Sequence, residues 1–136
     1  MTQIDPNTAG ALADELIAKE VAGQDKMWGV ANERTDSSKG QLLDAGLSQL
    51  TALSNRRKTG ARIDYNNPPA TYPENWSGFR DYGSDVANLV VGVAYLRQEI
   101  KRLIANGADT TRLTRDQATQ PFKFDKPAQP FPAEHA

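Results

Sequence analysis

A seven-residue repeat of apolar side chains limits most strongly what this chain can fold into. Large apolar residues recur at alternating steps of four and three: Tyr82, Val86, Leu89, Val93, Leu96, Ile100 and Leu103. This spacing averages about 3.5 residues per turn, at which an α-helix keeps one seam turned toward a packing partner. Asn106-Gly107 then stops a helix. The repeat predicts one long helix over 78–106, about 40 Å in length, that packs against more than one neighbouring helix.

Two shorter helices are predicted before it. Asp5-Pro6 has the residue types of an N-cap and a first helical position, which predicts a helix over about 6–27. Ser38 and Gln41 have the spacing of a capping box, and an apolar stripe follows on one helical face: Leu43, Leu47 and Leu50. Gly60, after three basic residues, is typical of a helix end. The second helix is therefore predicted over about 38–58.

The segments between and after these helices are rich in proline. Residues 59–78 contain three prolines together with Ile63, Tyr65, Tyr72 and Trp76, so we expect an irregular loop whose aromatic side chains pack across the helices or against a neighbouring subunit. Residues 108–136 contain four prolines and three phenylalanines, Phe122, Phe124 and Phe131. We expect an all-α domain at 1–107, with two helices packed on the long one, and an extended arm at 108–136 that its phenylalanines anchor.

Composition excludes several classes of function. The 136 residues include no cysteine and one histidine, His135, which argues against disulfide scaffolds, thiolate metal sites and histidine-based catalysis. A net charge of −1 argues against general nucleic-acid binding. Since the chain also lacks a membrane-spanning apolar run and the pattern of a signal peptide, we expect a soluble cytoplasmic protein.

Basic and aromatic side chains gather between the second and third predicted helices. The residues concerned are Arg56, Arg57, Arg62, Trp76, Phe79, Arg80 and Tyr82. Guanidinium groups match phosphate oxygens bidentately, aromatic faces stack on bases, and a helix N-terminus attracts anions. These residues therefore predict a site for a small phosphorylated ligand. The alternative is that the aromatic residues anchor the core and the charged residues lie exposed around them.

Carboxylates offer a second hypothesis, a magnesium site. Mg²⁺ prefers several carboxylate oxygens, and Asp81 and Asp85 are four residues apart, so that on one helix they would share a face, with Asp44 as a further ligand. The alternative is that these are solvated acids near helix N-termini, where negative charge is favourable.

Two segments resemble those of a known family. Gln24-Asp25-Lys26-Met27-Trp28-Gly29, preceded by Glu20, is similar to a motif near the start of small bacteriophage-encoded proteins described as MazG-like, and the segment from Leu96 to Leu103 resembles their closing helix. The resemblance implies an all-α, oligomeric, magnesium-dependent nucleoside triphosphate pyrophosphohydrolase. The family pairs Glu-x-x-Glu on one helix with Glu-x-x-Asp on the next, and this sequence has neither pair.

Three functions follow from these observations. The first is a non-catalytic, homo-oligomeric, phage-type binding module that holds a phosphorylated, nucleotide-like ligand near a subunit interface, without a cofactor, in the cytoplasm (the host's, if phage-encoded). The second is a divergent Mg²⁺-dependent pyrophosphohydrolase that uses Asp44, Asp81 and Asp85. The third is a structural or virion assembly protein that uses its C-terminal arm.

Overall fold

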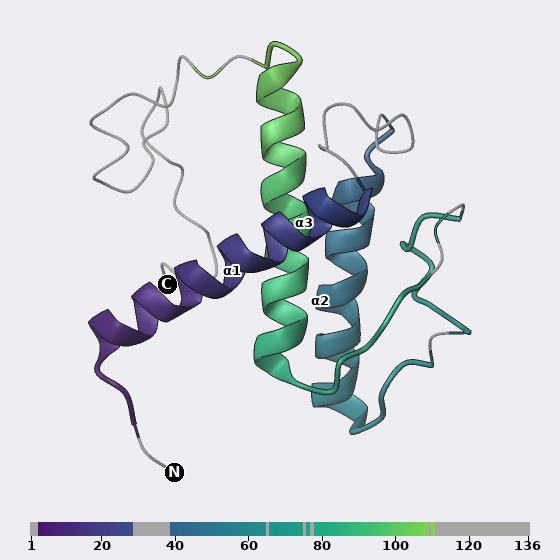
Figure 1. Ribbon diagram of the computed structural model, residues 1–136. Coiled ribbons are helices and arrows are strands. Elements are labelled where there is room, and N and C mark those ends of the chain that lie inside the picture. The colour runs from purple at the N-terminus through teal and green to yellow at the C-terminus, as the bar shows by residue number, and fades with distance from the viewer. Residues whose placement is uncertain are drawn as a thin grey trace, which may run out of the picture. The chain divides into compact units, whose positions relative to one another are not determined.

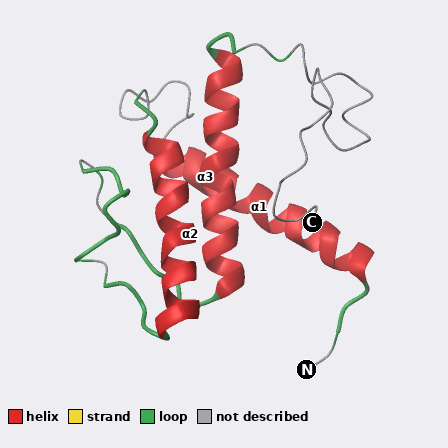
Figure 2. Ribbon diagram, turned by 180° about the vertical axis from the view of Figure 1, so that it is seen from behind, coloured by secondary structure: helices red, strands yellow, loops and turns green. Residues whose placement is uncertain are grey.

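A computed structural model describes residues 3–28, 39–64, 66–74, 76, 78–108 and 110. Within these ranges the chain forms three α-helices and no β-strand: α1 (Pro6–Trp28), α2 (Gln41–Thr59) and α3 (Asp85–Ala105). α2 and α3 lie side by side and antiparallel, and α1 crosses α3 (Figures 1 and 2). The prediction of a small all-α bundle is confirmed. No helix in the described part of the chain combines the length and apolarity needed to cross a membrane.

Most helix ends follow the local signals. The Asp5 side chain accepts hydrogen bonds from the backbone N–H groups of Asn7 and Thr8, at 3.0 and 3.2 Å, as expected of an N-cap. α2 ends at Gly60, which has a φ of 76° and donates its N–H to the carbonyl oxygen of Arg56. α2 begins at Gln41 without a side-chain cap. Ser38, and with it the predicted capping box, lies outside the described residues.

The third helix begins seven residues later than predicted. Ser84 is its N-cap and accepts from the N–H of Ala87 at 3.2 Å, while Gly78 and Gly83 have positive φ values of 89° and 73°. These glycines hold 78–84 in an irregular conformation that a helix cannot include. α3 therefore has 21 residues and is shorter than the 23-residue α1, so the prediction of one long helix carrying two shorter ones is wrong.

α2 and α3 approach each other through glycine. A methyl group on Gly46 would lie 2.8 Å from Cδ2 of Leu96 and 3.1 Å from the carbonyl oxygen of Gly92. Beside this contact lies a small apolar cluster from both helices, Leu42, Ala45, Val91 and Tyr95, against which Tyr72 and Trp76 of the intervening loop pack. The prediction that aromatic side chains fasten this loop across the helices is confirmed.

α1 packs on a different face of α3. The Gln98 amide of α3 donates to the carboxylate of Asp25 at 2.8 Å and to the carbonyl oxygen of Val21 at 3.5 Å. Val21 and Gln24 are the buried residues of α1, and many of the side chains N-terminal to them are exposed. α1 is thus attached mainly by its C-terminal half.

The seven-residue seam does not form the core of this chain. The buried residues of α3 lie on another face: Asn88, Val91, Gly92, Ala94, Tyr95, Gln98 and Glu99. The seam residues Val86, Leu89 and Val93 are 37–60% exposed. The physical reason is the close glycine contact, which leaves room between α2 and α3 for small or polar groups but not for a row of large side chains.

The C-terminal region is described in small part. The chain divides into two units, 1–106 and 107–136, and all three helices belong to the first. Of the predicted arm, the structure describes residues 108 and 110. The three phenylalanines expected to anchor the arm lie outside the described residues.

Candidate functional site

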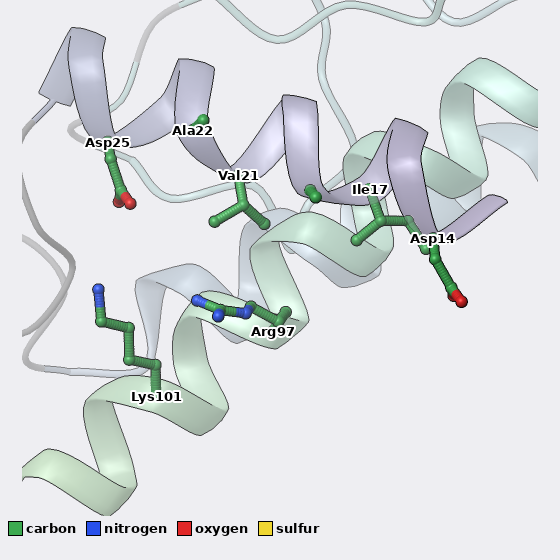
Figure 3. A pocket seen from close by; sticks show the side chains of 8 residues that line it. Asp14, Ile17, Val21, Ala22, Asp25, Arg97 and Lys101 are labelled. Carbon is green, nitrogen blue, oxygen red and sulfur yellow. The ribbon is translucent and has the colours of Figure 1, made fainter. Parts of the chain in front are cut away.

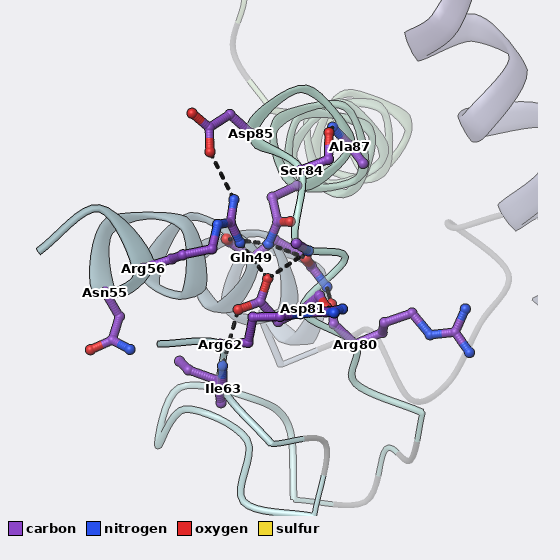
Figure 4. Close-up of polar contacts among 12 residues, drawn as sticks. Gln49, Asn55, Arg56, Arg62, Ile63, Arg80, Asp81, Ser84, Asp85 and Ala87 are labelled. Carbon is purple, nitrogen blue, oxygen red and sulfur yellow. Dashed lines mark hydrogen bonds and ion pairs between the residues drawn. The ribbon is translucent and has the colours of Figure 1, made fainter. Parts of the chain in front are cut away.

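A buried carboxylate, Asp81, organises the segment before α3. Its side chain is fully buried and accepts hydrogen bonds from the guanidinium of Arg56, from the N–H of Ile63 at 3.0 Å and from the N–H of Gly83 at 3.1 Å. Figure 4 shows these groups converging from α2, from the start of the loop and from the residues before α3. Asp81 thus joins both ends of the loop to the last turn of α2.

Arg56 is shared between two carboxylates. One of its Nη atoms binds Asp81 and the other binds Asp85 Oδ1 at 2.8 Å, while the arginine side chain is 14% exposed. The hydrogen bond to Asp85, opposed by partial burial but supported by the charge of Asp81, raises the pKa of Arg56. The guanidinium therefore stays charged and is occupied within the chain.

The environment of Asp81 keeps it ionised. Burial by itself would raise the pKa of this carboxyl, but hydrogen bonds from the N–H groups of Ile63 and Gly83 and the charge of Arg56, with a contribution from Asn88, outweigh it. The pKa of Asp81 is consequently lower than its ordinary value. Protonation of Asp81 is therefore unfavourable at neutral pH.

A second arginine fixes the backbone around this carboxylate. Arg62 donates from Nη2 to the carbonyl oxygen of Asp81, and its guanidinium lies so close to Gly83 that an added methyl group there would be 3.0 Å from Cζ. The Gln49 amide of α2 donates to the carbonyl oxygen of Arg80 at 3.1 Å. Residues 80–83 are therefore held from both sides.

A cleft of about 430 Å³ opens beside this network. It is lined by Arg62, Ile63, Gly78, Phe79, Arg80 and Asp81. The side chain of Arg80 extends away from Asp81 (Figure 4). Its guanidinium carbon lies 5.9 Å from the centre of the Tyr82 ring, and it has no carboxylate partner within the described ranges. Phe79 is 2% exposed and contributes an apolar wall.

The structure divides the seven predicted ligand-binding residues. Arg62, Phe79 and Arg80 line the cleft, and Tyr82 lies beside Arg80. Arg56 is bound to carboxylates, and Trp76 packs in the core, where its ring centroid lies 6.1 Å from that of Tyr95. The last member, Arg57, is exposed in the final turn of α2 and does not line the cleft.

The predicted magnesium ligands are not brought together. Asp44 lies in the first turn of α2, while Asp81 and Asp85 bind Arg56, twelve residues further along the same helix, which corresponds to about 18 Å. Asp81 precedes α3, so the expectation that it shares a helical face with Asp85 is wrong. In the ranges that the structure describes, no group of three or more acidic or histidine side chains is arranged to hold a metal ion.

A second cleft, of about 440 Å³, lies between α1 and α3 (Figure 3). Arg97 and Lys101 reach into it from α3, and Asp14 and Asp25 lie at its border on α1. The two cations and two carboxylates balance in charge. This cleft therefore has less attraction for an anion than the cleft beside Arg80.

Sequence reasoning missed the pairing of Arg56 with Asp81. It assigned the arginine to a ligand and the aspartate to a metal, whereas each is the other's partner. The sequence did contain a signal for this pairing: Arg56 and Asp81, with opposite charges, flank the long loop between two apolar helical segments. An antiparallel arrangement of the two helices brings the ends of this loop together.

No family model, curated protein or solved structure matches the chain. The resemblance to MazG-like proteins therefore has no independent support from these comparisons.

Proposed function

We propose that this chain is a non-catalytic, cytoplasmic binding module that takes a small phosphorylated, nucleotide-like ligand in the cleft lined by Arg62, Phe79 and Arg80. The observation that carries the proposal is the guanidinium of Arg80. Arg80 is among the residues that line the cleft, is exposed, and has no carboxylate partner among the described residues. Arginine in such a position binds phosphate oxygens with two parallel hydrogen bonds.

The charge balance of the cleft supports an anionic ligand. Asp81 is its one carboxylate. Asp81 already accepts hydrogen bonds from Arg56 and from two backbone N–H groups, and these donors offset its negative charge. With two arginines, Arg62 and Arg80, against one aspartate, the residues that line the cleft carry a formal charge of +1. Tyr82 is 39% exposed and lies beside Arg80, outside the lining of the cleft, where its ring can stack on a base that extends from the bound phosphate.

The positions of the carboxylates favour binding over hydrolysis of the same ligand. Asp44 lies near the opposite end of α2 from Asp81 and Asp85, and the latter two are engaged by Arg56. A magnesium-dependent pyrophosphohydrolase needs several carboxylate oxygens around one ion. The resemblance to MazG-like proteins supports a nucleotide as the ligand. It does not support the pyrophosphohydrolase reaction of that family, because the family's two carboxylate pairs are missing from this sequence.

Calorimetric titration of the full chain tests the proposal. The probes are adenosine and guanosine di- and triphosphates, pyrophosphate and inorganic phosphate. Arg80→Glu should weaken binding of the best probe at least tenfold. Arg57→Glu makes the same charge change on an exposed arginine outside the cleft and should leave the affinity within about twofold. Failure of the unaltered chain to bind any probe, or equal weakening by both variants, would overturn the proposal.

A further inference from the structure

Exposed apolar side chains line one side of the α2–α3 pair. They are eight large side chains that are 37–60% exposed: Leu43 and Leu47 of α2, and Val86, Leu89, Val93, Ile100, Leu103 and Ile104 of α3. We call these residues the apolar face. Five of them belong to the seven-residue repeat that the sequence shows, so the face carries a pattern typical of a helix–helix contact.

The two stripes of the apolar face lie on the same side of the helix pair. At about 100° per residue, Leu43 and Leu47 are turned by about 60° and 100° from Gly46, and Leu89 and Val93 by the same angles from Gly92. Gly46 and Gly92 face each other, and rotation in one sense leads to one common side because α2 and α3 are antiparallel.

The loop occupies the other side of the pair. Ala45 and Val91 are turned by about 100° in the opposite sense from these glycines. Both belong to the cluster against which Tyr72 and Trp76 pack. α1 contacts α3 through Gln98 and its neighbours, away from the contact with α2, and it borders the apolar face at Val86, which lines a cleft with Leu16 and Glu20 of α1. The other residues of the apolar face are covered neither by the loop nor by α1.

We infer that a second copy of this chain covers the apolar face, in a symmetric dimer whose two α2–α3 pairs form a four-helix bundle. The contact between large apolar seams needs a partner helix with the same spacing, and this chain itself supplies one. A two-fold axis places each apolar face against its equivalent, so every stripe is buried at once. The inference is independent of the ligand proposed above.

The area of the face is sufficient for such a dimer. A fully exposed Leu, Ile or Val side chain carries about 100 Å² of apolar surface, so eight that are roughly half exposed present about 400 Å² per copy. Two copies then bury about 800 Å² of apolar surface. If about 65% of the interface is apolar, as in homodimers, the total is about 1,200 Å², which is the lower bound of specific interfaces.

Light scattering coupled to size-exclusion chromatography tests this inference on the full chain. The unaltered protein should elute with twice the 14.9 kDa mass of the chain. Val93→Glu places a charge in the middle of the α3 stripe and should give a monomer with unchanged far-UV circular dichroism. Leu12→Glu is the matched control, because Leu12 is a helical residue of α1 that is 41% exposed and lies outside the apolar face; it should stay dimeric.

A crosslinking measurement keeps the test informative if Val93→Glu fails to fold. The chain has no cysteine, so Val93→Cys and Leu12→Cys each introduce a single thiol. A bifunctional maleimide, which does not require the two sulfur atoms to lie at disulfide distance, should convert much more of the Val93→Cys protein than of the Leu12→Cys protein into covalent dimer.

Three outcomes would overturn the inference. They are a monomeric unaltered chain, a folded Val93→Glu variant that remains dimeric, and equal crosslinking at both positions. If the unaltered chain is a monomer, the apolar face must instead be covered by residues beyond 110 of the same chain or by a different protein.

Discussion

The buried Asp81 carboxylate allows a sharp test of how the loop is held against the helices. Asp81→Asn removes the charge and replaces one oxygen with an NH₂ group, which in place of Oδ1 cannot accept from Arg56 or from the N–H of Gly83, and in place of Oδ2 cannot accept from the N–H of Ile63. Removing one partner of a buried ion pair costs about 3–5 kcal/mol. Because Arg56 keeps Asp85 as a partner, we expect the lower end, a loss of about 3 kcal/mol in the free energy of unfolding.

Urea unfolding followed by circular dichroism at pH 7 measures this loss. With a slope of about 1.5 kcal/mol per molar urea, the midpoint should fall by about 2 M. Asp85→Asn is the matched control, since this carboxylate binds the same arginine but is 61% exposed, and we expect a much smaller shift. Equal midpoints for the two variants, or an unchanged midpoint for Asp81→Asn, would refute the argument that the buried carboxylate fastens the loop.

The difference in stability between the unaltered chain and Asp81→Asn should depend on pH. Asp81 has a lower pKa in the folded chain than its ordinary value of 3.8, so its stabilising contribution is complete above pH 3.8 and is lost as the pH falls toward the folded pKa. The difference in unfolding free energy between the unaltered chain and Asp81→Asn should decrease by about 1.4 kcal/mol per pH unit in that window. A difference that stays constant from pH 7 to pH 2.5 would contradict this linkage.

Two further substitutions test the helices. Gly46→Ala places a methyl group 2.8 Å from the side chain of Leu96, so we expect the free energy of unfolding, measured by thermal denaturation, to fall by about 1–3 kcal/mol. Gly10→Ala in α1 is the control: nothing lies within 4 Å of the added methyl group, so this variant should be as stable as the unaltered chain or more stable by up to about 1 kcal/mol. Ser84→Ala removes the acceptor for the N–H of Ala87 and should cost about 1 kcal/mol, which Ser84→Asp should largely restore; equal stability of Ser84→Ala and the unaltered chain would contradict the cap.

Local signals in the sequence predicted those parts of the fold that local chemistry determines. Asp5 caps α1, Gly60 ends α2, and Asn106 with Gly107 ends α3, each through hydrogen bonds or a backbone conformation within a few residues. The start of α3 was predicted wrongly because the apolar repeat includes Tyr82. Gly83, with its positive φ, interrupts the helix there, and the periodicity of side chains carries no information about such a backbone angle.

The candidate site was less predictable, because its contacts are not local. Arg56 and Asp81 are 25 residues apart, and their pairing depends on the antiparallel arrangement of α2 and α3. Sequence spacing suggested that arginines near aromatic residues would face a ligand, but it did not show that a neighbouring aspartate would bind Arg56 first. Arg56 and Arg62 are bound within the chain, and Arg57 does not line the cleft. Arg80 therefore fits the predicted role of a ligand-binding residue best.

The glycine contact between α2 and α3 explains why the most regular sequence pattern lies outside the core. Gly46 and Gly92 bring the two backbones so close that bulky side chains at adjacent positions must turn outward on either side. On one side Tyr72 and Trp76 cover the gap. On the other side the turned-out residues, including Leu47 and five of the seven-residue repeat, form the apolar face. The physical consequence is a coupling that experiment can examine: Gly46→Ala forces the helices apart, so it should weaken dimerisation as well as folding.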